Sequence, residues 1–185
     1  MAELGSRLLL WSMLGAGLAL LLIASFRDVA LRTLPNWTSL GLAGVGGMLR
    51  LRDGTLPVGL AVALGVFGVA YLCWRRGWLG GGDVKLLAAC TLLVAPVQAA
   101  NLIVLTTLGG GVLAVVYLAL GLLLARSPGM ATAYTRPGHS RPGMLRRLWR
   151  LECRRIRRRA PLPYGCAIAG ATLVTLFGVA GPIGR

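Results

Sequence analysis

The chain has 185 residues, of which 56% are hydrophobic and only 14% are charged, and its formal net charge is +15. Its apolar residues occur in long runs rather than in the alternating patterns of a soluble domain, which indicates a protein that crosses a membrane several times. The positive charge does not indicate a nucleic-acid-binding domain, because eleven of the twenty basic residues lie in one stretch, residues 126–159, between two apolar runs.

Six apolar segments are predicted to be transmembrane helices, since an α-helix needs about 20 apolar residues to cross a hydrocarbon core of roughly 30 Å. These segments are residues 8–26, 37–51, 57–74, 86–100, 101–125 and 161–183, of which the second and the fourth are short. The first is longer than the apolar region of a signal peptide and no A-x-A site follows it, so we interpret it as a spanning helix. The predicted fold is all-α, a polytopic membrane helix bundle in which residues 1–185 form a single domain.

The distribution of basic residues predicts the orientation of this bundle. Short loops rich in arginine and lysine stay on the cytoplasmic side of a membrane. With six spans, loops 27–36, 75–85 and 126–160 share one side, and they hold sixteen of the twenty basic residues. We therefore expect these three loops in the cytoplasm and the N-terminus outside.

The basic loop at residues 126–160 is predicted to contain an amphipathic helix. In "MLRRLWRLECRRIRRR" the apolar residues recur at spacings of three and four, and arginines surround them. Such a helix favours the anionic lipids of the inner leaflet, and docking of a partner protein is the alternative.

Cysteines and glycines in the apolar runs have structural explanations. Cys73, Cys90, Cys153 and Cys166 form neither a C-x-x-C pair nor a metal-ligand spacing. We therefore predict no metal site, no disulfide framework and no cofactor. The glycines of "GLAGVGG" and of "LGGGV" (residues 109–111) lie inside predicted helices, where small residues let neighbouring helices approach closely.

Two of the five acidic residues point to chemistry. Glu3, Asp53 and Glu152 lie in a tail or beside arginines, whereas Asp28 and Asp83 lie at the cytoplasmic ends of different predicted helices. Ionisable residues at membrane depth are costly and are candidates for function. Two neighbouring carboxylates do not both ionise easily, so one keeps its proton, which is the state that an aspartic peptidase uses.

A structural role for both aspartates is the alternative to catalysis. Each carboxylate could cap a helix or pair with a nearby arginine, Arg27 or Arg32 for Asp28 and Arg76 for Asp83. The glycines before Asp83, at 80–82, also have two readings. They allow backbone dihedrals that are closed to other residues and a close approach to a substrate, or they form a flexible linker.

Three motifs resemble those of the type IV prepilin peptidases. "GGGD" at 80–83 has the G-x-G-D form of the membrane aspartic peptidases, and "DVALRTLPN" at 28–36 is similar to the first aspartate motif of the prepilin peptidases. "PLPYGCAIAGA" at 161–171 resembles the last helix of that family. The resemblance implies that Asp28 and Asp83 are the catalytic pair. It also implies site-shaping roles for Gly80, Gly82, Lys85, Pro35, Asn36, Pro163, Tyr164 and Gly165.

The resemblance implies an endopeptidase of the bacterial inner membrane. Its site would face the cytoplasm and cut the basic leader from prepilins or pseudopilins, with contact to the pilus assembly machinery and no nucleic acid as partner. The first apolar run begins almost at once, without the cytoplasmic cysteine-containing domain of larger members, so we expect the short form associated with Flp-type pili and no methyl transfer. The alternatives are a presenilin-like intramembrane peptidase and a non-enzymatic scaffold of a pilus or secretion machine.

Overall fold

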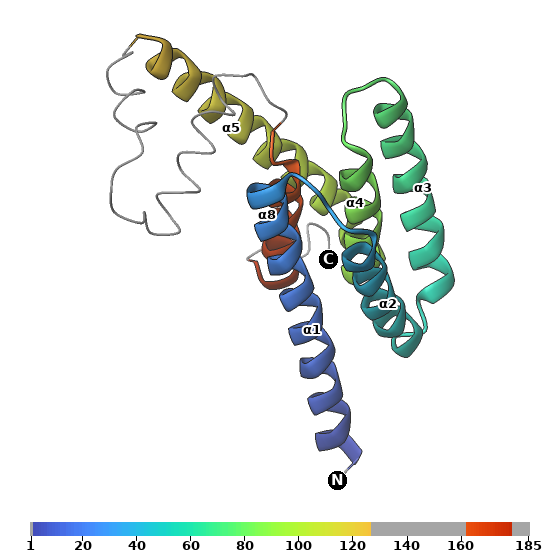
Figure 1. Cartoon of the computed structure of the whole chain (residues 1–185). Helices are drawn as coiled ribbons and strands as arrows, with labels where there is room; N and C mark the ends of the chain where they lie inside the picture. Colours follow the sequence, from blue (N-terminus) through green and yellow to red (C-terminus); the bar gives the residue numbers. More distant parts are fainter. Residues whose placement is uncertain (1, 127–161, 179–185) are drawn as a thin grey trace, which may run out of the picture. The chain divides into compact units, whose positions relative to one another are not determined.

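The computed structural model describes residues 2–126 and 162–178, and every element in these residues is helical. In chain order the elements are α1 (Ala2–Leu31), α2 (Asn36–Arg52), α3 (Leu56–Arg75), α4 (Gly81–Leu93), the short 3-10 helix η1 (Pro96–Gln98), α5 (Ala99–Arg126) and α8 (Tyr164–Phe177) (Figure 1). The predicted all-α class is confirmed for this part of the chain. The amphipathic helix predicted within 126–160 lies outside the described residues.

Three stretches of the described residues are long and apolar enough to cross a membrane, namely Arg7–Leu31, Leu56–Arg75 and Pro96–Leu123. They correspond to the first, third and fifth predicted spans. The second predicted span is helix α2 with 17 residues, and α8 has 14 residues. At 1.5 Å per residue, a helix as short as α8 extends only about 21 Å. Six spans and an outside N-terminus therefore stay predictions.

The fourth predicted span, residues 86–100, has the wrong bounds. Helix α4 already begins at Gly81 and ends at Leu93, and α5 begins at Ala99. Pro96 explains the early end, because proline disfavours the helical conformation in the residue before it and cannot donate a helical hydrogen bond. Val94 and Ala95 are accordingly extended, with ψ of 156° and 142°. The early start brings Asp83 into the first turn of α4 rather than into a loop.

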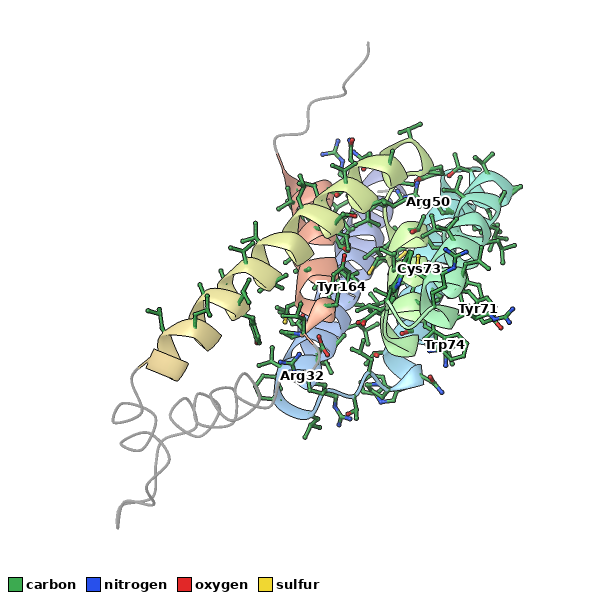
Figure 2. All side chains as sticks on the ribbon, turned by 90° about the horizontal axis from the view of Figure 1, so that it is seen from above. Arg32, Arg50, Tyr71, Cys73, Trp74 and Tyr164 are labelled. Atoms are coloured by element: carbon green, nitrogen blue, oxygen red, sulfur yellow. The ribbon has the colours of Figure 1, made fainter. Side chains whose placement is uncertain are left out.

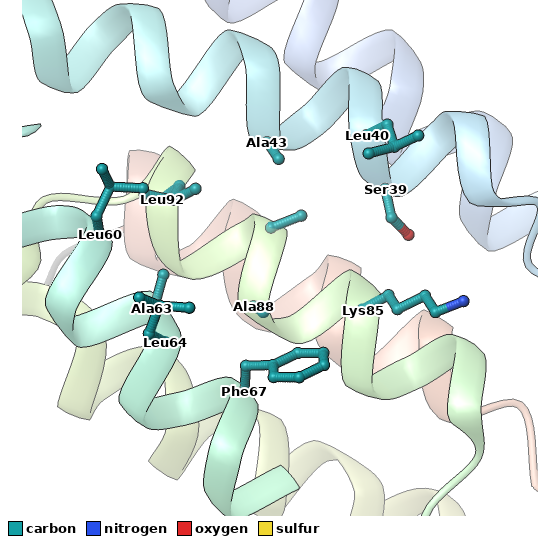
Figure 3. Close-up of a pocket in the computed structure, with 11 residues that line it drawn as sticks. Ser39, Leu40, Ala43, Leu60, Ala63, Leu64, Phe67, Lys85, Ala88 and Leu92 are labelled. Atoms are coloured by element: carbon teal, nitrogen blue, oxygen red, sulfur yellow. The ribbon is translucent and has the colours of Figure 1, made fainter. Parts of the chain in front are cut away.

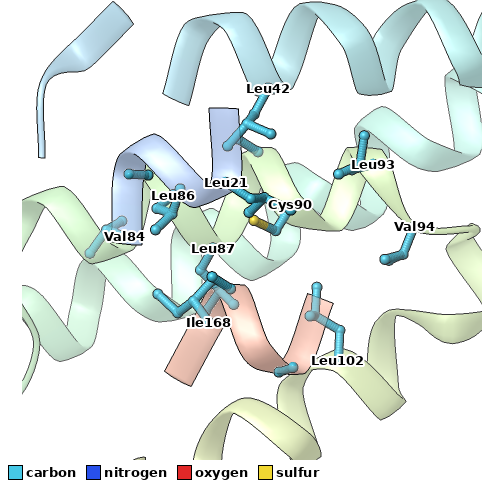
Figure 4. Close-up of a cluster of buried hydrophobic side chains, with 14 of the residues drawn as sticks. Leu21, Leu42, Val84, Leu86, Leu87, Cys90, Leu93, Val94, Leu102 and Ile168 are labelled. Carbon is cyan, nitrogen blue, oxygen red and sulfur yellow. The ribbon is translucent and has the colours of Figure 1, made fainter. Parts of the chain in front are cut away.

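Helix α4 forms the centre of the hydrophobic core. It packs against α2, α3 and α8, and α1 packs against α2 and α8. Most of its side chains are buried, as expected for a short helix that is apolar on all sides. The core includes Leu21, Leu42, Leu86, Cys90, Leu93 and Ile168, which come from four helices (Figure 4). This packing fixes the first turn of α4 relative to α1, α2 and α8.

The described residues fall into two compact units. The first contains α1 to α4, η1, α5 as far as Gly110, and α8, whereas the second contains the part of α5 that begins at Gly111. The core around α4 and both aspartates belong to the first unit. The candidate site is therefore built within one unit.

Candidate active site

Asp28 lies in the last turn of α1, where its side chain is buried and only 6% exposed. The sequence predicted that this residue follows the helix, in loop 27–36, but α1 continues to Leu31. No residue between 27 and 31 breaks a helix. Pro35 disfavours a helical backbone only at the residue before it, Leu34, which lies beyond the end of α1. The helix ends at Arg32, whose φ of 55° is left-handed and whose backbone N–H donates to the carbonyl oxygen of Asp28 at 3.0 Å.

The carboxylate of Asp28 binds the N-terminus of α8. Its Oδ2 accepts a hydrogen bond from the backbone N–H of Gly165 at 2.9 Å. Pro163 is the N-cap of α8 and Tyr164 its first residue, so this N–H belongs to the first turn, where backbone donors have no partner within the helix. A Cβ atom at Gly165 would lie 2.8 Å from the same Oδ2, so only glycine permits this approach. The structure thus brings the "PYG" motif to Asp28.

Asp83 caps the helix to which it belongs. Gly80 is the N-cap of α4 and Asp83 is the third helical residue, and the carboxylate accepts a hydrogen bond from the backbone of Gly80. An acidic side chain at this position that reaches back to the N-cap N–H is one half of a capping box. A Cβ atom at Gly80 would lie 2.6 Å from Oδ2 of Asp83, so the glycine leaves room for the carboxylate to fold back.

The two aspartates interact electrostatically. Burial raises the pKa of Asp83 from 3.8 to about 6, and the negative charge of Asp28 acts in the same direction. The hydrogen bond from Gly80 and the positive charge of Arg32 act in the opposite direction. Carboxyl groups that are 55 positions apart in the sequence are therefore close enough to influence each other's ionisation.

The arginine that acts on Asp83 is Arg32, not Arg76 as the sequence suggested. The guanidinium carbon of Arg76 lies over the ring of Trp78, 5.5 Å from its centroid. Arg32 follows Asp28 by one helical turn, and its charge reaches Asp83 on another helix. Figure 2 shows Arg32, at the end of α1, and Tyr164, at the start of α8. The sequence had suggested Arg32 only as a possible partner of Asp28, four positions earlier.

The glycines before Asp83 do not have the backbone conformation that was predicted. The glycines with positive φ are Gly54 and Gly77, whereas Gly80 is extended with φ of −74° and ψ of 143°. Residues 81 and 82 are helical, so the linker interpretation is also wrong. The absence of a side chain at these glycines is the property that matters. A Cβ atom at Gly82 would lie 2.9 Å from Cβ of Leu34, which fixes α4 against the connection between α1 and α2.

Lys85 and Asn36 join the start of α4 to the start of α2. The Nζ of Lys85 donates a hydrogen bond to Oδ1 of Asn36 at 3.0 Å. Asn36 is the first residue of α2 and Pro35 is its N-cap, with the extended backbone that this position needs. The connection after Asp28 is thereby attached to the helix that carries Asp83.

An apolar groove lies beside Lys85, between α2, α3 and α4. Its volume is about 210 Å³. It is lined by Ser39, Leu40, Ala43, Leu60, Ala63, Leu64, Phe67, Lys85, Ala88, Ala89 and Leu92 (Figure 3). Phe67 begins an aromatic row along α3, in which Tyr71 stacks on Phe67 and the ring of Trp74 is tilted against that of Tyr71. The groove suits an apolar chain, and Lys85 is its one charged lining residue.

The structure also places three of the cysteines and Asp53. Cys73, Cys90 and Cys166 form no disulfide among the described residues, and Cys153 lies outside them. Asp53 pairs with Arg50 at the far end of α2, with 3.3 Å between Oδ2 and Nη1. Asp53 therefore does not belong to the pair of acids formed by Asp28, at the end of α1, and Asp83, at the start of α4.

The model of the type IV leader peptidase family matches residues 15–127, which is more than half of the chain and includes both Asp28 and the stretch 80–83. The chain belongs to the type IV leader peptidase family. It is accordingly a peptidase, and its apolar helices make it a membrane protein. No curated protein and no solved structure matches the chain. Helix α8, with the Pro-Tyr-Gly motif, lies beyond the matched residues of this family member.

Proposed function

We propose that this family member is an aspartic endopeptidase that removes the basic leader from prepilins or pseudopilins, and that Asp28 and Asp83 are its catalytic pair. The observation that carries the proposal is that the charge of Asp28, in the last turn of α1, acts on Asp83, in the first turn of α4. Membership in the leader peptidase family favours this activity over that of a presenilin-like enzyme.

The two aspartates have different environments, which favours different roles. Asp83 has its pKa raised to about 6 by burial and by Asp28, so it is the member that holds a proton more readily. A bound peptide excludes water and raises this pKa further. Asp83 then serves as the general acid, which polarises the scissile carbonyl and later protonates the leaving amine.

Asp28 is the general base in this proposal. Its Oδ2 is held by the N–H of Gly165 at the N-terminus of α8, a setting that favours negative charge. The other oxygen takes a proton from the attacking water, and the hydroxide equivalent adds to the carbonyl carbon. Collapse of the tetrahedral intermediate breaks the C–N bond, and the proton on Asp83 goes to the amine.

We further propose that the site faces the cytoplasm of a bacterium and that its substrates are of the Flp-like type. The short connections after α1 and after α3 carry Arg32 and Arg76, and Leu34 of the first connection lies against Gly82 at the start of α4. A basic leader stays on the same side by the same rule, so enzyme and cleavage site meet there.

The test is co-expression of the chain with candidate prepilins, each with a basic leader before its apolar helix. We expect a mobility shift of the prepilin, and sequencing of the new N-terminus is expected to place the cut between leader and apolar segment. The Asp28→Asn/Asp83→Asn double variant is the matched control. Processing by this double variant at the wild-type level would refute the proposed function.

A further inference from the structure

The three consecutive glycines of α5 have different surroundings. A Cβ atom at Gly109 would make an ordinary contact of 3.6 Å with Cβ of Ala167, and one at Gly111 would meet nothing within 4 Å. A Cβ atom at Gly110 would overlap the ring of Tyr164, 2.7 Å from Cζ and 2.8 Å from the phenolic oxygen. Among these three positions, Gly110 is therefore the one at which a side chain is excluded.

Tyr164, whose ring occupies this space, is connected to both aspartates. Tyr164 is the first residue of α8, and the N–H of the following residue, Gly165, binds Asp28. The phenol of Tyr164 is also within electrostatic range of Asp83. The residue that follows Tyr164 thus binds one carboxyl group, the charge of the other acts on its phenol, and Gly110 of α5 lies against its ring.

We propose that Tyr164 is a third catalytic group of this site and that Gly110 is a positioning residue for it. The space at Gly110 admits the ring, so the hydroxyl lies beside the two aspartates and donates a hydrogen bond to the oxygen of the scissile carbonyl as this oxygen becomes negative. The phenol keeps its own proton throughout. This inference rests on the proposed peptidase function and adds a group that stabilises the transition state.

The size of the effect follows from the geometry. Non-bonded carbon atoms prefer separations of about 3.5–4.0 Å, so a methyl group at Gly110 must displace the phenol by roughly 1 Å. A displacement of about 1 Å in a catalytic group can lower a rate on the order of 10²-fold. Loss of one donor to a developing oxyanion costs roughly 10²- to 10³-fold in kcat.

Close helix packing is the competing explanation for Gly110, since glycine is common wherever membrane helices touch. The two explanations differ in how the effects of variants combine. If Gly110 acts only through the hydroxyl of Tyr164, a methyl group at 110 costs little more once that hydroxyl has been removed. If Gly110 serves packing, the methyl group costs the same with or without the hydroxyl.

The experiment measures kcat and KM for a prepilin that the wild-type protein cleaves. We expect Tyr164→Phe, which keeps the ring, to lower kcat roughly 10²-fold with KM unchanged, and Gly110→Ala to do the same. The Gly110→Ala/Tyr164→Phe double variant should be no slower than the slower single variant. Gly109→Ala and Gly111→Ala are the matched controls and should retain wild-type kinetics.

Three results would overturn the inference: wild-type kcat in Tyr164→Phe, full activity in Gly110→Ala, or multiplication of the two losses in the double variant. The amount of membrane-inserted protein is measured for each variant, and Tyr164→Phe decides the role of the hydroxyl even if Gly110→Ala inserts poorly. Wild-type protein and Asp83→Asn in the same assay report on the proposed function separately. An inactive wild-type protein refutes that function and the inference with it.

Discussion

The backbone N–H of Gly165 donates a hydrogen bond to the Oδ2 of Asp28, 137 positions earlier in the chain, at 2.9 Å. This bond joins the end of α1 to the start of α8. Asp83 lies close enough to respond to the charge of Asp28, and it caps its own helix through Gly80. The carboxylate of Asp28 thus binds at the N-terminus of α8, whereas Asp83 lies in the first turn of α4, where burial nevertheless raises its pKa.

Replacement of either aspartate by asparagine is expected to abolish cleavage. The asparagine side chain keeps an oxygen that can accept the bond from Gly165 or from Gly80, so the fold is expected to persist. It has no titrating group, so general acid-base catalysis worth at least roughly 10²-fold is lost. Cleavage of a co-expressed prepilin measures the effect. Asp53→Asn, at the far end of α2, is the matched control, and appreciable processing by an inserted Asp28→Asn or Asp83→Asn protein would exclude the catalytic pair.

Asp83→Asn is also expected to stabilise the protein near neutral pH. The native state raises the pKa of Asp83 from 3.8 to about 6, so the folded protein binds this proton more tightly than the unfolded chain does. The contribution to stability is complete below about pH 4 and is lost as pH rises through about 6. Asparagine removes this penalty, which is on the order of 2 kcal/mol once partial exposure is allowed for.

Thermal unfolding in detergent, followed by tryptophan fluorescence, measures this stabilisation. The Tm of Asp83→Asn should exceed that of the wild-type protein at pH 7.5, and the difference should shrink toward pH 4. A lower Tm for the variant at pH 7.5 would contradict the raised pKa of Asp83 in the folded protein.

The sequence was sufficient to predict the helices that follow from composition alone. Long apolar runs predicted α1, α3 and α5, because the length of an apolar run sets the length of a spanning helix. The glycines at 109–111 were expected to let helices approach, and Gly109 and Gly110 lie against α8, whereas a Cβ atom at Gly111 would meet nothing within 4 Å. The pairing of Asp28 with Asp83 was a hypothesis from their positions at predicted helix ends, and the structure brings them within electrostatic range.

The sequence was insufficient where tertiary packing decides. The bounds of α4 were missed because its N-cap and its first two residues are glycines, which local propensity assigns to a loop. In the folded protein, Asp83 caps this turn and Leu34 packs against Gly82, so the helix begins at Gly81. The partner of Asp83 was missed for the same reason. Arg32 is far from Asp83 in sequence and reaches it only because α1 and α4 lie together.

Arg32→Asn is expected to shift the pH dependence of cleavage. Asparagine tolerates the left-handed backbone at this position, where φ is 55°, so the connection after α1 should keep its course. The positive charge of Arg32 lowers the pKa of Asp83, so its loss raises that pKa. The limb of the kcat/KM profile that reports deprotonation of Asp83 should therefore move to higher pH. Arg76→Asn, whose side chain lies over Trp78, should leave the profile unchanged, and an unshifted profile in Arg32→Asn would contradict the assignment.

The connections after α1 and after α3 are expected on the cytoplasmic side. In a variant without native cysteines, Thr33→Cys and Trp78→Cys should react with an impermeant maleimide only after the membrane is permeabilised. Arg52→Cys, at the end of α2, should react in intact cells. Positions 33 and 78 are expected on the same side because Lys85, after the second connection, donates a hydrogen bond at 3.0 Å to Asn36, after the first. This bond holds both connections at one end of the first unit. Labelling of positions 33 and 78 from opposite sides would be incompatible with the proposed site.

Gly82→Ala is expected to reduce cleavage, and Gly82→Val to reduce it more, with little loss of inserted protein. A Cβ atom at 82 would lie 2.9 Å from Cβ of Leu34, an atom that moves only with its backbone. The added group therefore pushes the first turn of α4, and Asp83 with it, away from the connection that follows Asp28. A shift of this kind can lower the rate by about 10-fold for alanine and roughly 10²-fold for valine.

Gly81 is the matched control for Gly82. A Cβ atom there would lie 3.2 Å from Nε1 of Trp74, whose side chain is 45% exposed and has open space into which to move. Gly81→Ala and Gly81→Val are therefore expected to cleave a prepilin faster than the corresponding variants at 82. The comparison uses initial rates at equal amounts of membrane-inserted protein. Valine at 82 would press on Cβ of Leu34, which moves only with its backbone, whereas valine at 81 would press on the exposed ring of Trp74. Equal tolerance of valine at the two positions would therefore mean that contact with Leu34 does not set the position of Asp83.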